Sequence, residues 1–175
     1  SAQTEYVFTD VSPLFLQNAS EKFRDYDFVS YRLLDLERDP LTQGFAAQAF
    51  DVIVAVNVLH ATADLSRTLA ALRTLLAPGG VILLGEATVA RRWLDITFGL
   101  TEGWWRFDDH ALRPAHPLLN GTSWVRLLES SGFRDATALP ASDRRRALMP
   151  ALLTEAHRDL APARERFVAG SGYSE

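Results

Sequence analysis

The stretch Phe50-Asp51-Val52-Ile53-Val54-Ala55-Val56-Asn57-Val58-Leu59 decides the fold class of this chain. Its almost unbroken run of apolar and β-branched residues is typical of a parallel strand that is covered on both faces. Leucines with helical spacing follow, namely Leu65, Leu69, Leu72, Leu75 and Leu76. A Pro78-Gly79-Gly80 turn then leads into a second apolar run, residues 81–84. This order of strand, helix and strand predicts an α/β fold with a mostly parallel sheet and helices on both faces.

A similar unit precedes this stretch. Residues 6–9 read as a short strand, and Ser12-Pro13 has the pattern of a helix start with proline in the first helical position. We therefore expect a helix from about residue 13 to 23, followed by a second strand over residues 28–34.

Beyond Glu86 the composition changes. Aromatic residues cluster over residues 93–107, which we interpret as an insertion or lid near the carboxyl edge of the sheet. A further strand is expected at 133–139, and two short helical stretches broken by Pro150 and Pro162 are expected after it. We accordingly divide the chain into a core, residues 1–139, and a helical extension or interdomain linker, residues 140–175.

Length, charge and composition exclude several classes of protein. A chain of 175 residues suffices for one domain. The 18 basic and 22 acidic residues give a net charge of −4, so no affinity for nucleic acid or an anionic membrane is expected. Cysteine is absent, which excludes disulfides, thiolate metal sites and a cysteine nucleophile. Neither a signal pattern nor a stretch long enough to span a membrane is found, so we expect a cytoplasmic location.

No metal site is expected either. His110, His116 and His157 lack the mutual spacing of metal ligands. The cluster Asp108-Asp109-His110 is interpreted as part of a solvated loop.

Polar residues at the carboxyl ends of parallel strands carry the functional information, because open α/β sheets bind their ligands there. The candidates are Asp10, Asp35, Asn57, His60 and Glu86. A carboxylate that ends a strand of a nucleotide-binding sheet can accept hydrogen bonds from both ribose hydroxyls, and Asp10 fits this role. Alternatively, Asp10 only caps the helix that follows. Asp35 could accept from an adenine amino group, or it could be a solvated acid in a turn.

His60 and Glu86 follow neighbouring strands and could meet at one edge of the sheet. An imidazole with a carboxylate on its second nitrogen is a good general base, because the carboxylate fixes the tautomer and favours the imidazolium that forms. The alternative is a histidine that makes only a structural hydrogen bond.

A Gly-rich loop should accompany such a nucleotide site, about 20 residues before the acidic residue that binds the ribose. No G-x-G-x-x-G pattern occurs in the sequence, and counting back from Asp10 places the loop before Ser1. We therefore expect an incomplete sheet that lacks both its central first strand and the cofactor loop.

Taken together, the motifs resemble those of the S-adenosylmethionine-dependent C-methyltransferase domains of modular polyketide synthases. The most specific are Asn57-Val58-Leu59-His60-Ala61-Thr62 and Gly103-Trp104-Trp105. The resemblance covers about residues 5–139 and is carried by residues 6–13, 34–40, 50–62, 76–80, 86 and 93–105. It implies a Rossmann-like, three-layer methyltransferase fold of the class I superfamily.

The resemblance also implies roles for single residues. His60 resembles the general base that removes a proton from the α-carbon of a β-ketoacyl thioester on an acyl carrier protein, and Glu86 resembles its orienting partner. Asp10 and Asp35 resemble the ribose and adenine contacts of S-adenosylmethionine, and Asn57 lies beside this cofactor. The implied partners are the carrier-bound substrate and the neighbouring synthase domains.

Three functional hypotheses remain at this stage. The first is a working polyketide synthase methyltransferase, which the presence of both His60 and Glu86 favours. The second is a catalytically silent pseudo-methyltransferase that serves as a spacer between synthase domains, which a chain starting just before the second strand favours. The third is a free-standing methyltransferase of small molecules, which the family-specific segments disfavour. Because the Gly-rich loop is absent, we expect the chain alone to bind S-adenosylmethionine weakly or not at all.

Overall fold

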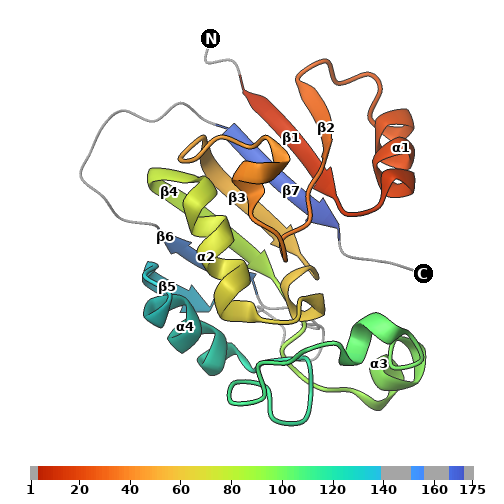
Figure 1. Cartoon of the computed structure of the whole chain (residues 1–175), viewed down its shortest axis with the longest axis vertical. Coiled ribbons are helices and arrows are strands. Elements are labelled where there is room, and N and C mark those ends of the chain that lie inside the picture. The colour runs from red at the N-terminus through yellow and green to blue at the C-terminus, as the bar shows by residue number, and fades with distance from the viewer. Residues whose placement is uncertain (1–3, 139–150, 156–165, 172–175) are drawn as a thin grey trace.

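In the computed structural model, which describes residues 4–138, 151–155 and 166–171, the strands form one sheet. Its seven strands lie in the order β2-β1-β7-β3-β4-β6-β5 (Figure 1). They are β1 Glu5–Asp10, β2 Val29–Leu33, β3 Phe50–Val56, β4 Leu76–Gly85, β5 Arg134–Ala138, β6 Ala151–Glu155 and β7 Arg166–Ser171. The helices are α1 Pro13–Lys22, α2 Leu65–Leu75, α3 Arg92–Thr97 and α4 Gly121–Ser130, with short 3₁₀ helices η1 Pro40–Gln43, η2 Leu59–Ala61 and η3 Glu102–Trp105.

The predicted α/β fold with parallel strands is confirmed. Strands β1, β2, β3, β4 and β7 pair in parallel, and only β6 runs antiparallel, to both β4 and β5. The helix predicted from the leucine spacing is α2, which crosses in front of β3 and β4 (Figure 1). Its leucine face is buried, as the spacing predicted, and each buried leucine side chain contributes roughly 1.5–3 kcal/mol.

Strand β3 is shorter than the apolar run suggested, because the backbone turns at Asn57. This residue has φ = 53°, in the left-handed region that asparagine tolerates better than β-branched residues do. The strand therefore ends at Val56, and Leu59–Ala61 form η2 instead. This turn lifts the chain out of the sheet at its carboxyl edge.

The expectation of helical stretches after the strand at 133–139 is wrong for the residues that the structure describes there. Residues 151–155 and 166–171 are the strands β6 and β7. Both pair with strands of the core, and such tertiary pairing overrides local propensity. Pro150 and Pro162 lie outside the described residues. The division at residue 139 stays a prediction.

The centre of the sheet also differs from expectation. We expected a gap in the middle of the sheet, where the first strand would lie. Instead, β7 lies between β1 and β3, and Val168 is in register with both Val7 and Ile53. Backbone groups on the inner edges of β1 and β3 thereby gain hydrogen-bond partners, which buried peptide groups require. Within the described residues the sheet is continuous, and Gly170 lies opposite Thr9 and Ala55 near its carboxyl edge.

Candidate active site

The five candidate residues all lie at the carboxyl edge of the parallel strands. Asp10 is the last residue of β1, Asn57 follows β3 directly and Glu86 follows β4 directly. Asp35 comes two residues after the end of β2, and His60 lies in η2, just beyond β3. Because these strands run in parallel, their carboxyl ends share one edge, which is where α/β proteins bind their ligands.

His60 and Glu86 are in direct contact. Nδ1 of His60 lies 2.7 Å from Oε2 of Glu86, whose side chain is fully buried. The other carboxylate oxygen, Oε1, accepts hydrogen bonds from the backbone N–H groups of Val58 (3.0 Å) and Leu59 (2.8 Å). Three donors thus compensate the burial of this carboxylate and fix it against the turn that carries His60.

This contact determines which nitrogen of His60 is free for chemistry. A carboxylate only accepts hydrogen bonds, so the neutral imidazole carries its proton on Nδ1 and presents a lone pair on Nε2. Within the described residues, no hydrogen bond to Nε2 is found. The side chain of His60 is 11% exposed, so a small part of this largely buried imidazole reaches the surface.

Aromatic side chains pack against the imidazole of His60. The ring of Trp104 lies edge-on to His60, with centroids 5.4 Å apart, and stacks on Phe98 at 5.6 Å. Asp95 also contacts Trp104: its Oδ1 accepts a hydrogen bond from the indole N–H at 3.3 Å. Trp104 is buried, whereas the neighbouring Trp105 is half-exposed.

Asp10 also has a local structural contact. It is buried, and its Oδ1 accepts from the backbone N–H of Ser12 at 2.8 Å, where α1 begins. Ser12 itself makes no side-chain cap, so Asp10 orders the start of the helix, as the alternative interpretation expected.

Asp35 lies in a turn between β2 and η1. Its Oδ1 accepts from the backbone N–H of Glu37 at 2.9 Å, and its own N–H donates to Oε1 of Gln43 at 2.8 Å. The residue is partly buried at the edge of the sheet. Asp35 can therefore both stabilise this turn and accept a hydrogen bond from a ligand.

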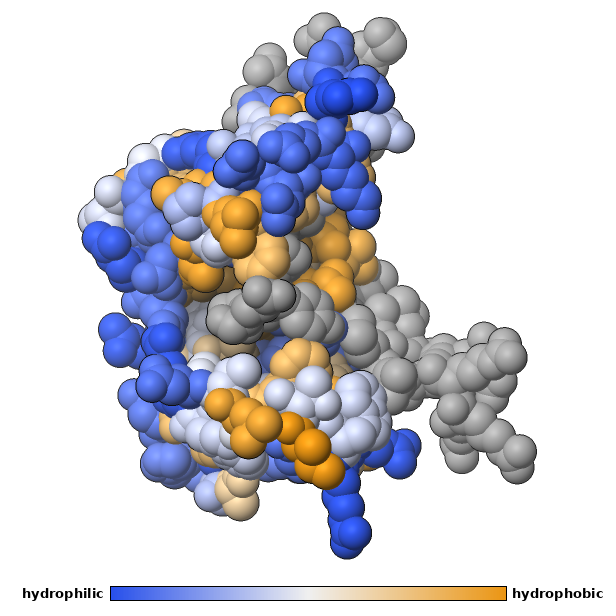
Figure 2. Space-filling view, turned by 90° about the vertical axis from the view of Figure 1, so that its right-hand side faces the viewer, coloured by the Kyte–Doolittle hydropathy of each residue, from blue (hydrophilic) through white to orange (hydrophobic). Residues whose placement is uncertain are grey.

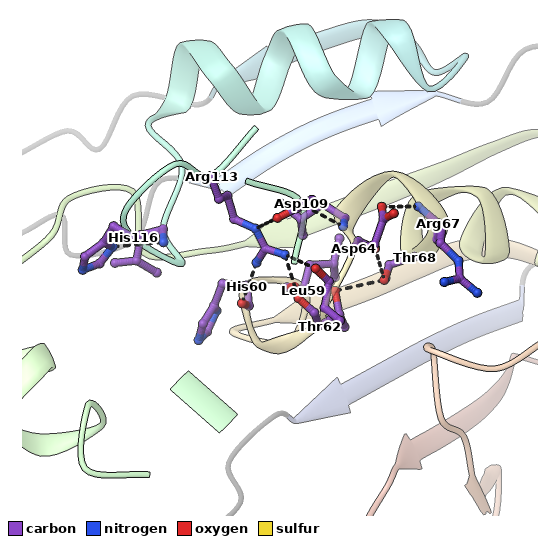
Figure 3. A network of polar contacts seen from close by, with 12 residues as sticks. Leu59, His60, Thr62, Asp64, Arg67, Thr68, Asp109, Arg113 and His116 are labelled. Carbon is purple, nitrogen blue, oxygen red and sulfur yellow. Dashed lines mark hydrogen bonds and ion pairs between the residues drawn. The ribbon is translucent and has the colours of Figure 1, made fainter. Parts of the chain in front are cut away.

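Arg113 was not among the candidate residues, yet it is fully buried against the turn that carries His60 (Figure 3). The interpretation of Asp109 as part of a solvated loop is wrong, because this side chain is only 10% exposed and pairs with Arg113. An isolated arginine before a proline carries no local signal of such a role. Only the fold brings residue 113 to residue 60.

Two further features concern ligands and membranes. Across the described parts of the chain, no group of three or more His, Asp or Glu residues has the arrangement needed to hold a metal ion. None of the helices described is long and apolar enough to cross a bilayer.

Comparison with known proteins identifies the class. Residues 1–82 match the family model described as "Methyltransferase domain". Polyketide synthase ThaG of Burkholderia thailandensis is 43% identical over 141 residues, which make up 79% of this chain and 2% of that protein. Methyltransferase calH of Penicillium decumbens is 40% identical over 136 residues, 78% of this chain and 37% of that protein.

Solved structures agree with this assignment. The CurJ carbon methyltransferase superimposes with a TM-score of 0.86 and 47% identity, covering 89% of this chain and 42% of that one. The trans-methyltransferase CalH, solved in complex with SAH, gives a TM-score of 0.78 and 38% identity, covering 87% and 42%. The chain thus spans less than half the length of each of these four relatives.

The fold, the family model and the structural match define a domain of the methyltransferase class. Within that class, the chain is closely related to the C-methyltransferase domains of polyketide synthases.

Proposed function

We propose that this domain transfers a methyl group from S-adenosylmethionine to the α-carbon of a β-ketoacyl group on an acyl carrier protein. The observation that carries the proposal is the contact between His60 and the buried Glu86 at the carboxyl edge of the sheet. The relatives that are named as carbon methyltransferases and polyketide synthases supply the reaction class. Carrier protein and neighbouring synthase domains are the partners we propose on the same basis.

His60 is the general base of the proposed reaction. The α-proton of a β-ketoacyl thioester lies between two carbonyl groups, which makes it acidic enough for an imidazole to remove. Nε2 takes this proton, and the carboxylate of Glu86 stabilises the imidazolium through Nδ1. The proton then leaves to solvent, which restores the base.

The residues at the edge suit the proposed cofactor. Asp10 and Asp35 end or follow neighbouring strands and offer carboxylate acceptors for ribose hydroxyls and an adenine amino group, and Asn57 adds an amide between them and Glu86. A bound S-adenosylmethionine supplies a methyl group on a sulfonium sulfur, which the enolate carbon of the substrate accepts as the carbon–sulfur bond breaks. Alignment of the reacting atoms at this edge contributes to the rate.

Apolar surface beside the base suits an acyl substrate. Figure 2 shows hydrophobic side chains gathered at the end of the molecule where Figure 1 places α3. The exposed hydrophobic residues of α3 and the segment after it are Trp93, Ile96, Leu100 and Trp105. Large exposed apolar patches mark binding surfaces, and this one adjoins Trp104.

The test uses the complete product of the gene that encodes this chain. It is incubated with S-adenosylmethionine and a β-ketoacyl carrier protein, and mass spectrometry follows the gain of one methyl group. The variant His60→Ala should lose methyl transfer by roughly 10²- to 10⁴-fold, the usual contribution of a general base. Its affinity for S-adenosylmethionine should stay nearly unchanged, and an equal loss of both would assign His60 a structural role only.

A catalytically silent spacer between synthase domains is the alternative function. The coding sequence before Ser1 separates the two. A Gly-rich loop encoded there, with cofactor binding by the gene product, supports the enzyme. If the gene encodes no such loop and its product does not bind the cofactor, the spacer is supported.

A further inference from the structure

Arg113 makes several hydrogen bonds to the turn that carries the proposed base. Its guanidinium group is fully buried, and four N–H donors make hydrogen bonds (Figure 3). Nη1 donates to the backbone carbonyl of His60 at 2.9 Å, and Nη2 donates to those of Thr62 at 2.8 Å and Ala63 at 2.9 Å. Nε donates to Oδ1 of Asp109 at 2.5 Å, which pairs the buried cation with an anion.

The turn is therefore held from two sides by opposite charges. Glu86 accepts from the backbone N–H groups of Val58 and Leu59, which precede the base, while Arg113 donates to the carbonyls of His60 and the residues after it. The N–H end of a helical turn is electropositive and its carbonyl end electronegative, so both contacts match the dipole of the turn. Neither Glu86 nor Arg113 can move without loss of hydrogen bonds to this turn.

Asp109 extends this support to the helix that follows. Its Oδ2 accepts from the backbone N–H of Leu65, the first residue of α2, at 3.0 Å. Thr68 in the next turn of α2 donates its hydroxyl to Oγ1 of Thr62 at 2.9 Å. The segment from η2 to the start of α2 is thus fastened to residues 109 and 113, which come from a distant part of the sequence.

We propose that Arg113 is a positioning residue for the methyl transfer: it holds η2 so that Nδ1 of His60 stays on Glu86 and Nε2 stays open to the substrate. The inference rests on the proposed function for its kinetic part. An arginine is needed because its planar fork reaches three carbonyls and a carboxylate at once. Lysine has one compact ammonium group and cannot span these acceptors.

Three variants test the proposal. Arg113→Lys keeps the charge and loses the fork. The double variant Arg113→Met with Asp109→Asn removes cation and anion together, so that no buried charge is left unpaired. Arg73→Met is the matched control, because Arg73 is exposed and donates to a single backbone carbonyl, that of Ser131, away from the site.

Two readouts on the 175-residue chain need no methyl transfer. Nitrogen NMR of the imidazole reports the share of the Nδ1–H tautomer of His60, and amide hydrogen exchange reports the hydrogen bonds of Val58 and Leu59 to Glu86. Arg113→Lys and the double variant should lower the tautomer share and speed exchange at these two amides more than at Ile82 in β4. In the complete gene product, kcat should fall roughly 10- to 100-fold, as expected for a misplacement on the order of 1 Å.

Two results would contradict a positioning role for Arg113. Uniform acceleration of exchange across Ile82, Val58 and Leu59, with an unchanged tautomer, would reduce Arg113 to a general stabiliser of the fold. An unchanged kcat in both variants of an active gene product would overturn the positioning role. If the wild-type gene product transfers no methyl group, the proposed function fails, and the two readouts on the chain still decide whether Arg113 positions His60.

Discussion

Glu86 reaches across the carboxyl edge of the sheet to Nδ1 of His60, 26 residues earlier in the chain, and binds it at 2.7 Å. The two residues belong to the ends of neighbouring strands, β3 and β4, which pair in parallel. The sheet itself therefore sets their separation. A carboxylate at this point makes His60 a base through its other nitrogen, and this arrangement leads to the first prediction.

Replacing Glu86 with glutamine should remove the base function while the fold is kept. The amide oxygen of Gln can still accept from the N–H groups of Val58 and Leu59, but its NH₂ group would then face Nδ1 of His60 as a donor. Nδ1 must accept, so the proton moves to Nε2 and blocks the base. We expect kcat for methyl transfer to fall roughly 10²-fold or more, measured by mass spectrometry on the gene product.

The control for this variant is Glu129→Gln, a change of the same kind at an exposed residue of α4. It should leave kcat at the wild-type value. Wild-type activity in Glu86→Gln would show that the tautomer of His60 does not matter and would contradict the base mechanism.

Asp10 allows its two roles to be separated by a pair of substitutions. Asp10→Asn keeps an oxygen for the N–H of Ser12, so α1 should still start correctly, while Asp10→Ala removes this contact as well. If Asp10 binds the ribose, both variants should weaken S-adenosylmethionine binding by about 10- to 100-fold, the equivalent of a lost hydrogen bond to a charged group. Calorimetry on the gene product measures this.

Thermal unfolding completes that comparison, because only Asp10→Ala should lower the melting temperature. A wild-type affinity in Asp10→Asn, together with a destabilised Asp10→Ala, would leave Asp10 as a helix cap and nothing more.

The strand–helix–strand unit of β3, α2 and β4 and the position of the candidate residues at the carboxyl edge could be predicted from the sequence, because both follow local rules. The apolar run at β3 and the leucine spacing of α2 reveal the strand–helix–strand unit, and polar residues after strand ends reveal the edge. Arg113 was not predictable in this way. Its role depends on a long-range contact between its guanidinium group and the carbonyl of His60, which no periodicity or spacing signals.

The C-terminal strands were not predictable for a related reason. Residues 151–155 and 166–171 carry no strong alternation, and their strand conformation depends on partners that are far away in the sequence. The stop of β3 at Asn57 shows the same limit on a smaller scale, because a positive φ at this asparagine ends a run that composition alone would continue.

The chain by itself is predicted to bind S-adenosylmethionine weakly or not at all. No G-x-G-x-x-G loop is present to bring backbone N–H groups and a helix start to the cofactor. Isothermal titration calorimetry of the chain measures this, with the complete gene product as the comparison. Micromolar binding by the chain alone would contradict the prediction and would mean that other backbone groups at the carboxyl edge replace the loop.

Removing β7 should destabilise the domain, because this strand is hydrogen-bonded on both sides in the middle of the sheet. Each net hydrogen bond contributes about 1 kcal/mol, so a chain that ends at residue 165 should lose several kcal/mol of unfolding free energy in urea. It should also associate, since the inner edges of β1 and β3 become open to other strands, which light scattering detects. A chain that ends at Ser171 keeps β7 and is the control. Equal unfolding midpoints for the two shortened chains would show that β1 and β3 do not depend on β7 for their pairing.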